Sequence, residues 1–99
     1  MRDIEKRYLV ELYVGPIDAD TIRAALTNAR SAEQASRQAS PVRLLDSVFV
    51  LPDETCLLIY DARSAQALER ALLQANVAFD RVVEAVQHKP SPSLTQIAP

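Results

Sequence analysis

Polar and apolar residues alternate along the first stretch of the chain, at residues 6–14, which are also rich in residues that favour strands. One side of this stretch carries Tyr8, Val10, Leu12 and Val14. Gly15 and Pro16 follow directly and are typical of a turn. The pattern therefore predicts a first strand over residues 6–14.

Helical spacing of apolar residues begins after Asp18 and Asp20, either of which can accept hydrogen bonds from the free N–H groups of a helix start. The apolar stripe consists of Ile22, Ala25, Leu26, Ala29 and Ala32. We expect this helix to fade before Pro41, because proline lacks an N–H group and disfavours helix at the residue before it.

A second helix is expected after Ser64, which is a plausible N-cap residue. Its apolar stripe consists of Leu68, Ala71, Leu72 and Ala75. Asn76 follows and tolerates the left-handed backbone conformation that commonly ends a helix.

Two apolar runs, residues 42–51 and 54–61, flank a short polar turn. Pro52 presets a turn conformation and Asp53 is a favoured turn residue, so the two runs are expected to pair as a hairpin. The second run is apolar on both faces, which is typical of a strand in the middle of a sheet. Residues 79–87 supply a fourth strand.

The expected order is β-α-β-β-α-β, the arrangement of ferredoxin-like α+β sandwiches. Right-handed crossovers then give a four-stranded antiparallel sheet in the order 4-1-3-2, with both helices on one face. The opposite face is nearly as apolar, through Leu45, Phe49, Leu58, Val82 and Val86 or their alternates. Because monomeric proteins rarely expose a patch of that size, we expect a homodimer through the sheet face, associated like a dimeric α+β barrel.

The chain has 99 residues and a mass of 10.9 kDa, which suits one ferredoxin-like domain over residues 1–88. Residues 89–99 are rich in proline and are expected to form a flexible or partner-docking tail. A net charge of −2 without a basic run argues against nucleic-acid binding. No apolar segment is long enough to span a membrane, and a single cysteine excludes an internal disulfide, so a cytoplasmic location is expected.

Three runs, "YLVELYV", "SVFVLPDETC" and "FDRVVEAV", resemble those of a small bacterial ferredoxin-like family that was formerly catalogued as a domain of unknown function and includes a dimeric nickel-binding protein. The resemblance extends over roughly residues 6–87. The matching polar positions are Glu11, Ser47, Asp53, Glu54, Cys56, Arg81 and Glu84. This resemblance implies a homodimer that binds a divalent metal, plausibly nickel.

Glu11 and Glu84 lie in the first and fourth strands, which the expected order makes antiparallel neighbours. If they pair directly, two carboxylates share one face, and such a pair either raises one pKa or attracts a cation. The alternative is that Glu84 guards a sheet edge while Glu11 meets a basic residue such as Arg81 or Arg43.

Glu54 and Cys56 are two residues apart in the hairpin and could form half of a metal site, since nickel accepts both thiolate and carboxylate ligands. Alternatively, Cys56 is a small core residue and Glu54 helps to close the turn. His88, the only histidine, could be a further ligand or simply be exposed. Because the chain has no second His or Cys, a specific site would need two subunits or mainly carboxylates.

Tyr8, Tyr13 and Tyr60 could line a pocket for a small ligand in a cleft of the sheet, or they could simply pack. An isomerase-like enzyme with Glu11 or Glu84 as its base is therefore an alternative, although the sequence contains no catalytic motif that assigns a reaction. A third alternative is a non-catalytic association module.

Overall fold

The computed structural model describes residues 5–88, and the expected tail at residues 89–99 lies outside them. The observed elements follow the expected β-α-β-β-α-β order. They are β1 (Lys6–Tyr13), α1 (Ala19–Ala35), β2 (Arg43–Val50), β3 (Thr55–Ala62), α2 (Ala65–Gln74) and β4 (Arg81–Glu84). The fold is thus α+β and ferredoxin-like, with a four-stranded antiparallel sheet and two helices.

The strands lie in the order β2-β3-β1-β4, which is β4-β1-β3-β2 when it is counted from the opposite edge. The two central strands pair along their whole length, from Lys6 opposite Ala62 to Tyr13 opposite Thr55. On the other side of β1, β4 pairs Tyr8 with Glu84 and Glu11 with Arg81. Residues that face each other in this register point to the same side of the sheet.

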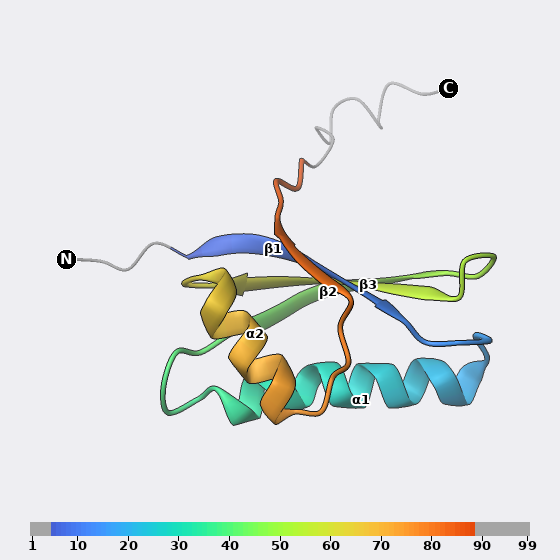
Figure 1. Cartoon of the computed structure of the whole chain (residues 1–99), viewed down its shortest axis with the longest axis horizontal. Helices are drawn as coiled ribbons and strands as arrows, with labels where there is room; N and C mark the ends of the chain where they lie inside the picture. The colour runs from blue at the N-terminus through green and yellow to red at the C-terminus, as the bar shows by residue number, and fades with distance from the viewer. Residues whose placement is uncertain (1–4, 89–99) are drawn as a thin grey trace, which may run out of the picture.

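Both helices lie against one side of the sheet (Figure 1). The core between the two layers contains the alternate residues of the central strands, namely Tyr8, Val10, Leu12, Cys56, Leu58 and Tyr60. From α1 only Ala29 and Ala32 are fully buried, whereas α2 buries Leu68 and Leu72. Small side chains on α1 let this helix lie close to the sheet.

Each helix begins at the cap that the sequence indicates. The Asp18 carboxylate accepts a hydrogen bond of 2.8 Å from the Thr21 N–H group, and the Ser64 hydroxyl accepts one of 3.1 Å from Ala67. Asn76 has a φ of 60° directly after α2, which confirms the left-handed residue expected at that helix end.

The structure selects between the two sets of residues that the sequence left open for the uncovered sheet face. Leu58 and Val82 both pair with the buried Val10 and therefore face the helices. In β2, a register shift between Leu44 and Asp46 reverses the side that the later residues face, so Phe49 turns toward the core. The uncovered face is formed by the alternates of these residues.

The fourth strand is also shorter than expected, at Arg81–Glu84 instead of residues 79–87. Its partner β1 begins at Lys6, and the register places Val86 opposite that first residue. The last backbone hydrogen bond between the two segments is the one of 2.9 Å from the Ala85 N–H group to the Arg7 carbonyl oxygen, and Val86 is 95% exposed.

Candidate functional site

The side of the sheet that faces away from the helices is here called the open face. Its centre is apolar, because Leu9 pairs with Ile59 and Val83, and Leu57 pairs with Val48. Val48 is 47% exposed, and the other four side chains are half-buried although no helix covers them. These five apolar residues thus shield one another only from the side, which leaves their upper surfaces in contact with water.

At one end of the open face, the carboxylate of Asp61 is bound by two arginines. Arg7 donates two hydrogen bonds to Asp61, from Nε at 2.9 Å and from Nη2 at 3.2 Å, and Arg43 donates a third at 3.4 Å. Asp61 is only 8% exposed. The hydrogen bond from Arg7 is the main cause that lowers the pKa of Asp61 below its ordinary value, and the Arg43 hydrogen bond adds to it. The end of the open face with these two arginines is here called the basic end, and Asp46 faces the same side one pairing nearer the centre, opposite Ile59.

The other end of the open face is acidic. Glu11 lies 3.8 Å from Arg81, and the Tyr13 hydroxyl donates a hydrogen bond of 2.7 Å to Glu54. The Asp80 carboxylate accepts a hydrogen bond of 2.8 Å from the Tyr13 N–H group. Three carboxylates and one arginine therefore give this acidic end net negative charge.

Of the two arrangements considered for Glu11 and Glu84, direct pairing of the two carboxylates does not occur. Glu11 pairs with Arg81 and points to the open face, whereas Glu84 pairs with Tyr8 and has the parity of the helix side. Glu84 lies 3.8 Å from Lys6, and both side chains are more than half exposed. The alternative expectation, an edge-strand Glu84 and a Glu11 that meets Arg81, matches this arrangement.

Glu54 and Cys56 do not form a half-site. Glu54 belongs to the hairpin turn and bonds to Tyr13 at the acidic end, while Cys56 is fully buried on the helix side. Burial raises the pKa of the Cys56 thiol to about 11, so the thiolate that a metal requires is strongly disfavoured. Cys56 is thus a core residue.

His88 is exposed beyond the end of β4. Within residues 5–88, no three His, Cys, Asp or Glu side chains gather in a way that could hold a metal ion. The five proposed ligands Glu11, Glu54, Cys56, Glu84 and His88 are therefore not assembled within one chain.

The tyrosines serve different purposes. Tyr8 and Tyr60 fill the core, and Tyr13 is 62% exposed at the acidic end. The hydrogen bond to Glu54 is the main cause that raises the pKa of the Tyr13 phenol above its ordinary value. Together they do not line a cleft on the sheet.

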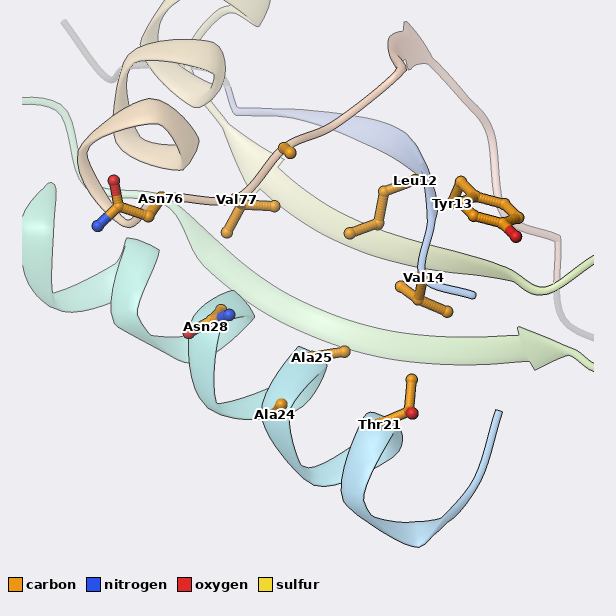
Figure 2. A pocket seen from close by; sticks show the side chains of 10 residues that line it. Leu12, Tyr13, Val14, Thr21, Ala24, Ala25, Asn28, Asn76 and Val77 are labelled. Atoms are coloured by element: carbon orange, nitrogen blue, oxygen red, sulfur yellow. The ribbon is translucent and has the colours of Figure 1, made fainter. Parts of the chain in front are cut away.

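A cavity of about 370 Å³ lies on the helix side, between the end of β1, the first half of α1 and the segment after α2 (Figure 2). Leu12, Val14, Ala25 and Val77 contribute apolar atoms to its lining, and Asn28 contributes an amide. Neither Glu11 nor Glu84 lines it.

Sequence reasoning missed Asp61 with its two arginines and missed this cavity. For the first, a signal exists: Arg7, Asp61 and Arg43 occupy one register row across three strands. For the cavity, the signal is faint, because it consists of alanines at the start of α1 where larger residues would fill the space.

The fold defines the class of protein: a ferredoxin-like α+β domain with one uncovered sheet face. No protein-family model matches the sequence, and neither does any curated protein. Among solved structures, SCO4226 from Streptomyces coelicolor A3(2) is similar, with a TM-score of 0.66 and 14% identity over 84% of this chain and 99% of that chain. At this identity the similarity supports the fold alone. Among the described residues, no helix is long and apolar enough to cross a membrane.

Proposed function

We propose that the protein is a homodimeric association module whose two copies pack through their open faces. The observation that carries this proposal is the uncovered apolar centre, with Val48 47% exposed in the single chain. Packing it against a second sheet removes apolar surface from water, which is the main favourable term in association. The single, buried and reduced thiol of Cys56 suits a reducing compartment, and we propose that the dimer is cytoplasmic.

The charges at the two ends favour a second copy of this chain as the partner. The basic end has Arg7 and Arg43 around Asp61, and the acidic end has Glu11 and Glu54. A two-fold axis that lies between the sheets and runs across the strands places the basic end of one copy over the acidic end of the other. Both ends then meet opposite charge, which supports this orientation.

The mass of the particle in solution tests the dimer. Sedimentation equilibrium should give twice the 10.9 kDa of one chain. Leu57→Lys puts a charge in the centre of the open face and should yield a monomer with an unchanged circular dichroism spectrum. Leu73→Lys is the matched control, because Leu73 is 65% exposed on α2, far from that face, and this variant should stay dimeric.

A monomeric wild-type chain at all working concentrations would refute the proposal. So would a Leu57→Lys variant that keeps the mass of the dimer.

Nickel binding is a second candidate function. The position of two carboxylates favours a site that two copies of the chain share. Of the five expected ligands, Glu11 and Glu54 lie at the same end of the open face. A two-fold axis along the strands would bring the acidic ends of two copies together, and a divalent cation would offset their repulsion. This orientation differs from the one proposed above.

Calorimetric titration with nickel separates the two orientations. A shared metal predicts saturable heat that is lost in Glu11→Gln and Glu54→Gln and retained in Glu84→Gln, since Glu84 has the parity of the helix side. It also predicts that nickel strengthens dimerisation. Absence of saturable heat in the wild-type protein would leave only the metal-free dimer.

A further inference from the structure

The two helices differ in length, and the difference leaves space beside α1. With 17 residues, α1 is about 26 Å long, whereas the 10 residues of α2 extend about 15 Å. Figure 1 shows that α1 continues past the end of α2 beneath the sheet. The first half of α1 therefore has no neighbouring helix, and the cavity of about 370 Å³ lies there.

Small side chains keep this space open. The inner wall is formed by the buried Leu12 and Val77, and the wall on α1 is formed by Ala24 and Ala25 (Figure 2). Each alanine ends at its Cβ atom, so neither sends a side chain across the gap. The volume falls within the range of about 300–1,000 Å³ that is typical of small-molecule sites.

The lining is mostly apolar and is uncharged. Of the ten described residues around the cavity, none carries a formal charge. Figure 2 shows Thr21 at one end and Asn28 at the other. The Thr21 hydroxyl is already engaged with Asp18 and the Pro16 carbonyl oxygen, both at 2.9 Å. Asn76 lines the cavity with a second exposed amide, but Figure 2 shows its side chain extending away from the other labelled residues. The exposed amide of Asn28 is therefore the polar group expected to meet a ligand, as both donor and acceptor.

We propose that this cavity binds a small, uncharged and largely apolar molecule, and that the Asn28 amide holds the hydrogen-bonding group of that molecule. An anion or a cation would lose its hydration without meeting an opposite charge, so the site discriminates against charged analogues. The cavity lies on the helix side of the sheet, and Tyr13 is the one lining residue that it shares with the acidic end of the open face. Binding here is therefore independent of the proposed dimer.

Two probes of similar shape test the choice of ligand. Naphthol is neutral with one hydroxyl, and naphthalenesulfonate carries a negative charge. Titrated into isotope-labelled full-length protein, naphthol should give saturable shifts of the amide NMR signals of residues around the cavity. Naphthalenesulfonate should bind at least about tenfold more weakly, because its charge is not compensated in this lining.

Two variants test the location. Ala25→Leu fills the space and should weaken naphthol binding more than about tenfold. Ala35→Leu is the matched control, since Ala35 is an exposed alanine at the other end of the same helix, and it should bind as the wild type does. Asn28→Ala is at the surface, leaves the core untouched, and should weaken binding roughly threefold to tenfold through the lost hydrogen bond.

The proposal is overturned if naphthol gives no saturable shifts or if the shifts lie on the open face. Equal affinity for the two probes would overturn it as well, and so would unchanged binding in both Ala25→Leu and Asn28→Ala. None of these results depends on whether the protein is a monomer or a dimer.

Discussion

The Tyr60 hydroxyl donates a hydrogen bond of 2.6 Å to the carbonyl oxygen of Ala29, inside the core between β3 and α1. Both residues are 0% exposed. Burial is the main cause that raises the pKa of the Tyr60 phenol above its ordinary value, and the nearby charge of Glu33 adds to it. The bond satisfies a polar group deep in the core and fixes α1 at one position on the sheet.

Removing this bond should destabilise the fold measurably. Tyr60→Phe keeps the ring and loses the hydroxyl, and we expect the free energy of unfolding to fall by about 1 kcal/mol. Urea denaturation monitored by circular dichroism measures the change. Tyr13→Phe is the control, because Tyr13 is 62% exposed and its hydrogen bond to Glu54 lies at the surface. Equal losses in the two variants would contradict a special role for the bond between Tyr60 and Ala29.

Asp61 should determine how far the free energy of unfolding decreases at acidic pH. Its folded-state pKa lies below the ordinary value of 3.8, so its contribution is complete above that value and is lost as the pH falls through the lowered pKa. Asp61→Asn should therefore reduce the free energy of unfolding at neutral pH by about 1–2 kcal/mol. In this variant the free energy of unfolding should also decrease less as the pH is lowered. Urea denaturation over a pH series measures both effects.

Asp20→Asn is the control for that series. Asp20 also meets an arginine, Arg23, at 2.7 Å, but its side chain is 88% exposed. A surface ion pair of this kind contributes less than about 0.5 kcal/mol. Should the two variants show the same dependence of stability on acidic pH, the hydrogen bonds from Arg7 and Arg43 to Asp61 would contribute no more than a surface ion pair does.

The sequence predicts the order of elements because each element has a strong local signal. Alternation marks β1, Asp18 and Ser64 mark the helix starts, and Asn76 marks a helix end. The side that each residue of β2 faces could not be derived in this way. It depends on the register shift between Leu44 and Asp46, which is a property of the pairing with β3 and not of local sequence.

The candidate site was harder to predict for a related reason. Whether two carboxylates on neighbouring strands meet depends on the pairing register, which must be known to the single residue. The observed register sets Glu11 opposite Arg81 instead of opposite Glu84. The cavity depends on the relative lengths of two helices that are distant in sequence. Cys56 was easier, since a lone cysteine in an apolar strand is typically buried, and here it is.

Cys56 should make the fold sensitive to alkali. Its ordinary pKa of 9.0 rises to about 11 on burial, so between these values the unfolded chain loses the proton and the folded chain keeps it. Stability should be unaffected below pH 9 and should fall as the pH rises through this window, by about 3 kcal/mol at most. Urea denaturation at a series of alkaline pH values measures the loss.

Cys56→Ala isolates this effect, because Tyr60 acts in the same direction and remains in the variant. The variant should be less stable at neutral pH by about 1 kcal/mol, owing to the small cavity, and should lose less stability toward alkaline pH. In the wild type, a disulfide reagent should modify the thiol only after unfolding. Rapid modification of the native protein would show that Cys56 is accessible.

Two left-handed residues at the same end of the sheet form a matched pair for the last prediction. Gly15 has a φ of 81° and a Cβ atom there would meet no atom within 4 Å, so Gly15→Ala tests backbone conformation alone. We expect it to lower the free energy of unfolding by about 1–2 kcal/mol.

Glu54 has a φ of 53°, and Glu54→Gly relieves this strain but loses the exposed hydrogen bond from Tyr13. Because an exposed bond contributes less than the relieved strain, Glu54→Gly should be neutral or stabilising by up to about 1 kcal/mol. Urea denaturation of both variants measures the two changes in the free energy of unfolding. If Glu54→Gly loses more stability than Gly15→Ala does, the Glu54 carboxylate, and not its backbone conformation, stabilises the turn.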